Sequence, residues 1–405
     1  MIKNKVNTKS EIYVTRAILS SYLILSLQYL IITVFAYQNL NLINIVQTIS
    51  KTAVAIMYIF AFPFVLRKKS LLIYSIYSLL TVIILFNILI WKNNVEYIKS
   101  EIFYLYFVTT ITFVYAYCIN GYDSFYERIT KLSNIILIIG LIASLFIFFS
   151  STGYSSSSIE KKYSMSLSYN LLMPLLIYTN DYIKNSNFIS LIKFILSFLI
   201  IILLGARGPI MCLGIFLILR FLKLDFKFNK KNIVINLITI LIVFILVINY
   251  EVIIFSLYRF SKDVIGMESR TLYNMIYVKG LNLTGRDKIY TTMINAIKEN
   301  PVFGVGFLGD RQYFTPYPHN IFIELIIQFG VFFGGIISLL LILLICYCLK
   351  ISKGKTYDLL ILWVSLGFGP LLVSNTYVEF IGFWVLLGLL FNIMNTNKLG
   401  GKNER

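Results

Sequence analysis

Acid–base chemistry near neutral pH can rest on only one side chain of this sequence. His319 is the single histidine in 405 residues, and it lies where a Gly/Pro-rich loop meets a long apolar run. With an ordinary pKa of about 6.5, an imidazole suits a general base acting on a hydroxyl group. The alternative is a capping or interfacial residue. Two acids, Glu324 and Glu379, lie within apolar runs near the same level, where ionisable groups usually face a cavity or a partner.

Arginines provide the groups that would bind an anion. Arg207 precedes a short apolar segment starting at Pro209, and a helix N-terminus there would add partial positive charge. Arg286 falls in the first turn of a helix predicted within residues 284–301, where free N–H groups attract phosphate. Three apolar residues at a spacing of four would form one face of this helix: Ile289, Met293 and Ile297. The alternatives are an Arg207 that reaches lipid headgroups and an amphipathic helix on the membrane surface.

The other candidate substrate-binding residues lie in the same region, in or beside the long loop. They are Arg259, Arg270, Arg311, Tyr317 and Asn320. Tyr317, with Tyr313 and Phe314, suits an interfacial aromatic belt or a platform that stacks on sugars. One histidine and four cysteines within apolar runs do not provide a zinc site, and no acidic cluster would hold magnesium. We therefore expect neither a metal nor a cofactor.

Composition predicts the elements that carry these residues. The chain is 58% hydrophobic and 13% charged, whereas soluble domains carry roughly 25% charge. Apolar runs recur that are long enough to cross a hydrocarbon core of about 30 Å. We expect an all-α polytopic membrane protein whose twelve transmembrane helices lie at about residues 17–37, 43–66, 70–91, 102–120, 133–150, 165–181, 187–204, 208–222, 232–250, 319–349, 358–374 and 378–395. The run after Ile321 is longer than a membrane requires, which places His319 at or above the outer headgroups.

The distribution of Lys and Arg orients these helices. With the N-terminus inside, 22 of the 36 basic residues fall in cytoplasmic segments, 6 in short outer segments and 8 in residues 251–318. Basic residues concentrate in cytoplasmic loops, which also explains the net charge of +18 without a nucleic-acid partner. We expect residues 1–405 to form one integral membrane domain in the lipid bilayer with both termini cytoplasmic. Residues 251–318 would form a long outer loop with amphipathic helices between the ninth and tenth transmembrane helices.

Three segments of the sequence resemble the O-antigen polymerase and O-antigen ligase superfamily. They are GARG around Arg207, GRDKIYTTMINAIKENPVFGVGF at 285–307 and HNIFIELIIQFGVFFG at 319–334. The resemblance implies a metal-independent membrane glycosyltransferase of GT-C-like architecture in the bacterial inner membrane, with its active site facing the periplasm. It also implies a donor glycan linked to undecaprenyl pyrophosphate.

The resemblance further implies roles for individual residues. His319 would take the proton of the acceptor hydroxyl, and Arg207 and Arg286 would hold the pyrophosphate. Glu324 would either orient His319 indirectly or fix an arginine.

The resemblance leaves two reactions open. A polymerase joins lipid-linked repeat units, with a chain-length regulator as the implied partner, whereas a ligase transfers the glycan to lipid A core; composition favours the polymerase. A transporter such as a flippase is a third class of function. Transporters place ionisable groups near the bilayer midplane in two related halves, whereas the charges here gather at one face and no repeat is visible.

Overall fold

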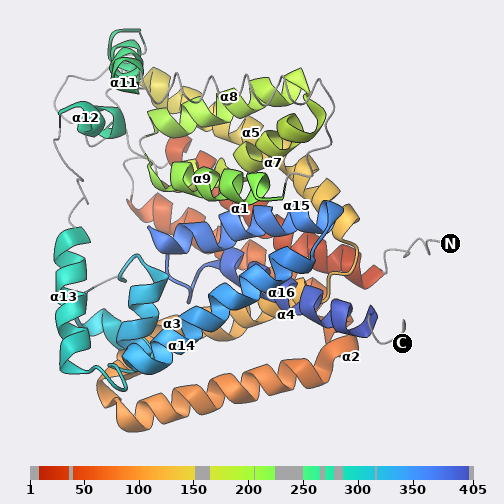
Figure 1. Cartoon of the computed structure of the whole chain (residues 1–405), viewed down its shortest axis with the longest axis vertical. Coiled ribbons are helices and arrows are strands. Elements are labelled where there is room, and N and C mark those ends of the chain that lie inside the picture. The colour runs from red at the N-terminus through yellow and green to blue at the C-terminus, as the bar shows by residue number, and fades with distance from the viewer. Residues whose placement is uncertain are drawn as a thin grey trace. The chain divides into compact units, whose positions relative to one another are not determined.

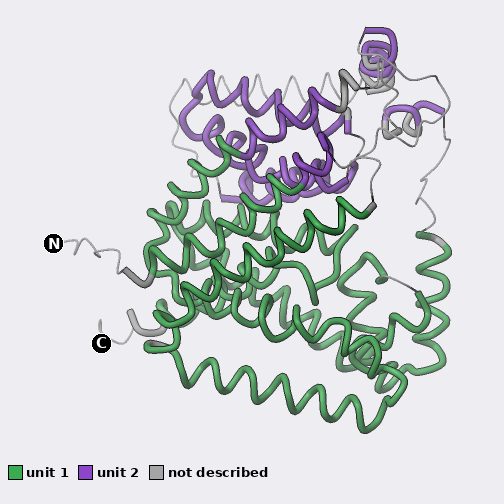
Figure 2. The backbone as a smooth tube through the Cα atoms, turned by 180° about the vertical axis from the view of Figure 1, so that it is seen from behind, with its two compact units in different colours: residues 1–28, 41–135, 283–405 green, residues 29–40, 136–282 purple. Residues whose placement is uncertain are grey.

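The computed structural model describes residues 9–35, 40–150, 165–204, 206–223, 250–264, 270–277, 286–314 and 317–400. The described residues form helices and connecting turns without strands (Figure 1), which confirms the all-α class. The chain divides into two compact units, shown in Figure 2. Unit 1 contains residues 1–28, 41–135 and 283–405, and unit 2 contains residues 29–40 and 136–282.

The α-helices follow the predicted order over most of the described chain. Their bounds are α1 Lys9–Phe35, α2 Leu40–Ile90, α3 Val95–Phe103, α4 Thr110–Tyr117, α5 Tyr122–Ser150, α6 Met165–Asn170, α7 Leu172–Asn185, α8 Phe188–Leu203, α9 Gly208–Phe221, α11 Tyr250–Arg259, α12 Arg270–Tyr277, α13 Arg286–Glu299, α14 Ile321–Ile351, α15 Gly354–Trp363 and α16 Ile381–Gly400. The helix predicted at 232–250 lies outside the described residues except for Tyr250. The predicted division of residues 187–222 into two helices is confirmed, because α8 ends at Leu203 and α9 begins at Gly208 with Pro209 in its first turn.

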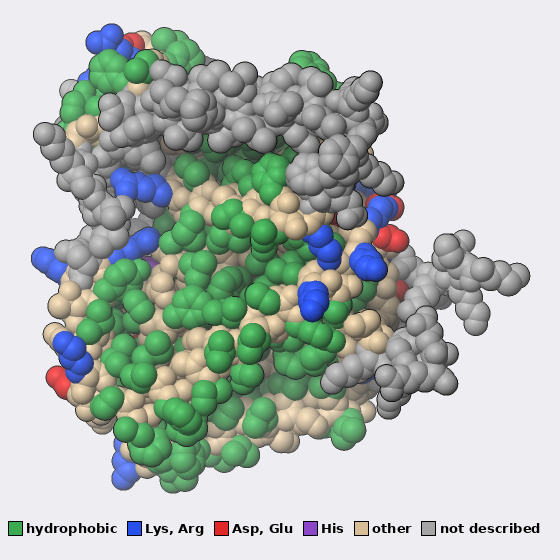
Figure 3. All heavy atoms as spheres, in the orientation of Figure 1, with side chains coloured by type: hydrophobic (Ala, Val, Ile, Leu, Met, Phe, Trp, Pro, Cys, Tyr) green, Lys and Arg blue, Asp and Glu red, His purple; other side chains and the backbone are tan. Residues whose placement is uncertain are grey.

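Five segments among the described residues are long and apolar enough to cross a membrane. They are Glu11–Phe35, Asn41–Arg67, Lys69–Ile90, Tyr122–Phe146 and Ile321–Ile351. The second and third both belong to α2, which is broken at the non-helical Lys69. Leu71 and Leu89 are 80% and 74% exposed, and hydrophobic side chains cover much of the face in Figure 3. Such a surface suits lipid rather than water, while the full set of twelve crossings remains a prediction.

Helix α14 is two helical segments joined at Gly330, whose φ of 80° and ψ of 168° are not helical. Residues 331–351 alone are about 31 Å long at 1.5 Å per residue, enough to cross the hydrocarbon core. The short segment Ile321–Phe329 therefore does not continue that span outward. The prediction of one unbroken helix over 319–349 is wrong at this glycine.

The loop after α13 satisfies the backbone groups that the break exposes. Val305 N donates to Ile327 O at 2.9 Å, Gly306 N donates to Gln328 O at 3.0 Å, and Val331 N donates to Pro301 O at 2.8 Å. Unpaired carbonyl groups within a broken helix are costly away from water. These bonds therefore stabilise the loop and the break together.

Two buried asparagines connect the same loop to the C-terminal end of α2 and to the turn that follows it. Asn87 Nδ2 donates to Phe307 O at 3.0 Å, and Phe307 N donates back to Asn87 Oδ1 at 2.8 Å. Asn94 Nδ2 donates to Val305 O at 3.0 Å. Because each amide both donates and accepts, Asn87 replaces the backbone partners that an irregular loop lacks. Neither asparagine attracts attention in the sequence.

Helix α13 packs its predicted apolar face onto this assembly. Ile289 and Met293 form a buried cluster with Ala296, Val305 and Ile327, and Ile297 packs against it. The spacing-of-four prediction is confirmed. The apolar stripe of α13 contacts the loop and the short segment of α14 rather than lying free on a membrane surface.

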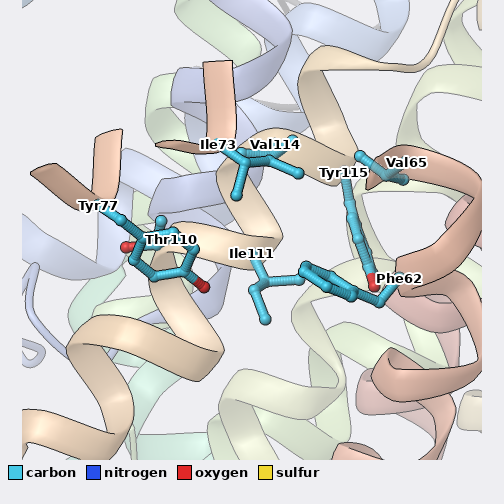
Figure 4. Close-up of a pocket in the computed structure, with 8 residues that line it drawn as sticks. All are labelled: Phe62, Val65, Ile73, Tyr77, Thr110, Ile111, Val114 and Tyr115. Atoms are coloured by element: carbon cyan, nitrogen blue, oxygen red, sulfur yellow. The ribbon is translucent and has the colours of Figure 1, made fainter. Parts of the chain in front are cut away.

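A small apolar recess lies between α2 and α4 (Figure 4), lined in part by Phe62, Ile111 and Val114. Its volume is about 10 Å³, which is close to the space occupied by one water probe. This recess is too small for a sugar or a lipid headgroup, and we treat it as a packing irregularity.

Substitution of Gly330 by Ala tests the role of the break. A Cβ there would meet Val302 O at 2.1 Å, and the positive φ is unfavourable for alanine. We expect the free energy of unfolding to fall by roughly 1–3 kcal/mol, the usual cost of such backbone strain.

Gly335→Ala in the same helix is the matched control, because its Cβ would meet nothing within 4 Å. Thermal unfolding in detergent measures both variants. Equal midpoints for the two would contradict the assigned role of Gly330.

Candidate functional site

A buried guanidinium, that of Arg311, organises the polar residues of unit 1. Its Nη1 contacts the Asp310 carboxylate, and its Nη2 lies 3.4 Å from Glu324 Oε1 and 3.2 Å from Thr376 Oγ1. Arg311 is 6% exposed and both acids are 0% exposed. Burial disfavours the charge, but the coulombic attraction of Asp310 and Glu324 prevails and raises the pKa of Arg311 above its usual value. The guanidinium therefore stays charged inside the protein.

Two further side chains, Gln328 and Tyr377, and a second hydrogen bond of Thr376 extend the contacts of Arg311 into one network. Gln328 Nε2 donates to Asp310 Oδ1 at 2.7 Å, the Tyr377 hydroxyl donates to Gln328 Oε1, and the Thr376 hydroxyl donates to Glu324 Oε1. These residues come from the loop before His319, the short segment of α14 and the segment before α16. We call Asp310, Arg311, Glu324, Gln328, Thr376 and Tyr377 the arginine network. It joins the loop and the short segment of α14 to residues 376–377, which lie about fifty residues further along the sequence.

His319 lies directly beside this network, at the start of α14. Its backbone is left-handed, with φ of 61°, which is uncommon for a residue with a side chain. The next residue, Asn320, caps α14: Oδ1 accepts from Phe322 N at 3.0 Å and Ile323 N at 3.3 Å. Asn320 Nδ2 also donates to Leu372 O at 3.3 Å. The cap fixes the point from which the imidazole projects.

The imidazole itself is oriented by a backbone carbonyl. Nδ1 lies 3.2 Å from Ser374 O, and a carbonyl oxygen can only accept, so Nδ1 carries the proton. This tautomer makes Nε2 the basic nitrogen. The ring packs edge-on against Tyr317 at 4.6 Å, and Tyr317 in turn lies under the Arg311 guanidinium at 5.5 Å.

The surroundings of His319 favour its neutral form. Burial lowers the pKa of His319, the Ser374 hydrogen bond offsets part of this effect, and the charges of Arg286 and Arg311 lower the pKa further. Because a depressed pKa leaves the imidazole unprotonated at neutral pH, it can accept a proton from an incoming hydroxyl. Arg286, one of these two charges, is the first residue of α13.

Comparison with known protein families gives a match for part of the chain. Residues 192–338 match a family model described as O-antigen ligase. This match supports the resemblance of the sequence to the O-antigen polymerase and O-antigen ligase superfamily over this segment. No curated protein and no solved structure matches the chain.

The matched segment includes Arg207, Arg286, Arg311, His319 and Glu324. It ends at residue 338, within α14, and so does not include Ser374, Thr376 or Tyr377. Glu324 has the second of its two predicted roles, because it pairs with an arginine, Arg311. The partners of Arg311 and Asn320 that the structure describes are protein groups. We infer that both residues position His319, and their contact with substrate remains a prediction.

Three predicted arginines belong to unit 2. Arg207 directly precedes α9, and Arg259 ends α11, where it is exposed and stacks 4.7 Å from the Phe255 ring. Arg270 begins α12, and its side chain lies outside the described residues. Their participation in a site with His319 remains a prediction.

The predicted acid Glu379 interacts with Glu101, a residue that the sequence analysis did not select. The carboxyl group of Glu101, on α3, interacts directly with that of Glu379, and the charge of Glu379 also acts on Tyr317. The sequence feature that could have identified Glu101 is its position as an acid at the edge of an apolar run. Asp310, Gln328 and Thr376 were also missed, because no sequence motif marks the contacts that they make in the folded chain.

The residues that the structure describes do not form a metal-binding site. No group of three or more His, Cys, Asp or Glu side chains that could hold a metal occurs within the described residues. The expectation of a metal-independent reaction remains a prediction for a chelator experiment.

Removing the Arg311 guanidinium should unfold this region. Arg311→Ala leaves Asp310 and Glu324 buried without their cation, and breaking a buried ion pair from one side costs about 3–5 kcal/mol. We expect a clear fall in the thermal midpoint of the purified protein in detergent.

The control for this prediction is Lys355→Ala. Lys355 pairs with Glu127 at 3.5 Å, but the two side chains are 49% and 65% exposed, and exposed pairs contribute about 0–1 kcal/mol. A midpoint for Arg311→Ala within the range of this control would show that the arginine network does not hold the fold.

Proposed function

We propose that this protein is a polysaccharide polymerase that joins oligosaccharide repeat units carried on undecaprenyl pyrophosphate. The observation that carries the proposal is the imidazole of His319, which Ser374 O orients and whose pKa is lowered by burial and by the charges of Arg286 and Arg311. A base next to a phosphate-binding group is what transfer from a lipid pyrophosphate to a hydroxyl requires. The match of residues 192–338 to the O-antigen ligase family model supports the same class of reaction.

The proposed step begins with the acceptor hydroxyl. Its oxygen attacks the anomeric carbon of the donor glycan while Nε2 of His319 takes the hydroxyl proton. The bond between the anomeric carbon and the pyrophosphate oxygen breaks, and the lipid pyrophosphate leaves with the electron pair. Arg286, joined in this proposal by Arg207, offsets the negative charge that grows on the leaving group. Arginine suits this task because its planar fork matches phosphate oxygens.

The proposed setting is the outer face of the bacterial inner membrane, with both termini in the cytoplasm. The exposed apolar spans and the basic residues of the predicted cytoplasmic segments support this orientation. The printed family description, O-antigen ligase, supports a second candidate, in which the acceptor is lipid A core. The chemistry at His319 is the same in both, and only the acceptor differs.

Reconstitution separates these candidates. Purified protein in liposomes is given lipid-linked repeat units alone, and we expect a ladder of longer glycans that persists in the presence of a chelator. His319→Ala should abolish the ladder, whereas the exposed-site control Lys355→Ala should retain it.

Other outcomes have defined meanings. Product that forms only after lipid A core is added would establish the ligase and exclude the polymerase. If His319→Ala cells accumulate lipid-linked units on the inner face, the function is transport.

The pH profile of the reaction tests the role of His319 separately. Because burial and nearby arginines lower its pKa, protonation should inhibit the enzyme only below the ordinary value of about 6.5. We expect kcat/KM to stay level from pH 8 to about 6.5 and to fall at lower pH. A fall that begins well above pH 6.5 would contradict a neutral, buried base.

A further inference from the structure

An open cavity of about 350 Å³ lies at the outer end of α2, away from the helix start that carries Arg286. It is bounded by the turn after α2, the end of α13 and the loop before His319. Its polar and aromatic lining residues are Trp91, Lys92, Asn93, Asn300, Gln312 and Tyr313. A concavity of this size is within the range of small-ligand sites, which begins at about 300 Å³.

The lining has the chemistry of a carbohydrate site. Trp91 and Tyr313 offer aromatic surfaces with an apolar body and a polar tip, which suit the C–H faces of a sugar ring. Asn93, Asn300 and Gln312 each carry an amide that donates and accepts, as neighbouring sugar hydroxyls require. A cavity built for an acyl chain would not present three amides and a lysine.

The cavity walls are fixed without a ligand. The indole of Trp91 lies over Gly306, where a Cβ would come within 2.6 Å of Trp91 Cδ2. Gln312 Nε2 donates to Asn94 Oδ1, and Tyr313 packs against the cluster beneath α13. A preformed site loses less conformational freedom on binding, which favours affinity for flexible polar ligands.

The position of the cavity indicates which part of the substrate it would hold. Asn300 directly follows α13, whereas Arg286 begins it, and this helix of 14 residues is about 21 Å long. The cavity is therefore distant from the group predicted to hold the pyrophosphate. It suits sugars remote from the reacting bond.

We propose that this cavity is a distal subsite for the oligosaccharide part of the substrate. The inference rests on the proposed function, since it assumes a glycan substrate. Binding energy gained at a remote subsite can position the reacting end of a long substrate. The subsite would let the enzyme recognise its own repeat unit at a place where no bond changes.

Binding of a lipid-free probe tests the proposal without requiring catalysis. The probe is the repeat-unit oligosaccharide released by mild acid from the lipid carrier of the same cells. It is titrated into full-length protein in detergent by calorimetry. We expect wild type and His319→Ala to bind it equally, and Trp91→Ala and Asn300→Ala each to bind about tenfold more weakly.

Tyr74→Ala is the matched control, because Tyr74 is a 63% exposed aromatic residue of α2 outside the cavity lining. Its affinity should equal that of wild type, and the folding of every variant is checked by its thermal midpoint. Asn300 is exposed, so Asn300→Ala remains informative if Trp91→Ala unfolds.

Three results would overturn the subsite: no binding to wild type, wild-type affinity in Asn300→Ala, or displacement of the probe by phospholipid vesicles. Failure of the proposed polymerase reaction appears differently. In that case the oligosaccharide binds as expected, and wild type makes no glycan ladder.

Discussion

The structure depends on the burial of the Arg311 guanidinium between two carboxylates. Charged groups leave water at a large cost, and they remain buried only where partners of opposite charge and hydrogen bonds compensate. Asp310, Glu324 and Thr376 provide that compensation for Arg311. These partners come from the loop before His319, from α14 and from the segment before α16. The contacts of Arg311 therefore fix the positions of these three segments relative to one another. One of those pieces includes Ser374, whose carbonyl orients His319.

The break in α14 makes this arrangement compatible with a membrane. A straight helix of 31 residues would carry its first turns beyond the hydrocarbon core, away from the rest of the protein. Gly330 instead ends the membrane-crossing segment, and the loop of residues 301–306 takes up the carbonyls left at the break. Irregular backbone near a membrane is tolerated when protein groups satisfy it. The short first segment of α14 is thereby available to present His319 and Glu324 to one common region.

Periodicity and charge predicted the parts of this structure that depend on local sequence. The helix starting near Arg286, its apolar face through Ile289 and Met293, and the helix break before Pro209 all follow from neighbours a few residues apart. The break at Gly330 was not predictable in that way, because Gly334 and Gly335 lie in the same apolar run and look equivalent. What distinguishes Gly330 is contact with Val302, and that contact forms only in the folded chain. Asn87 illustrates the same limit, since its partner Phe307 is 220 residues away.

The protonation of His319 can be measured without overlap from other residues, because the sequence has no second histidine. Nitrogen NMR of protein labelled at histidine, titrated in detergent, reports both the protonation and the tautomer of His319. Our account predicts one neutral form with the proton on Nδ1 and a midpoint below pH 6.5. A midpoint above that value, or a proton on Nε2 in the neutral form, would contradict the assignment of His319 as a base held by Ser374.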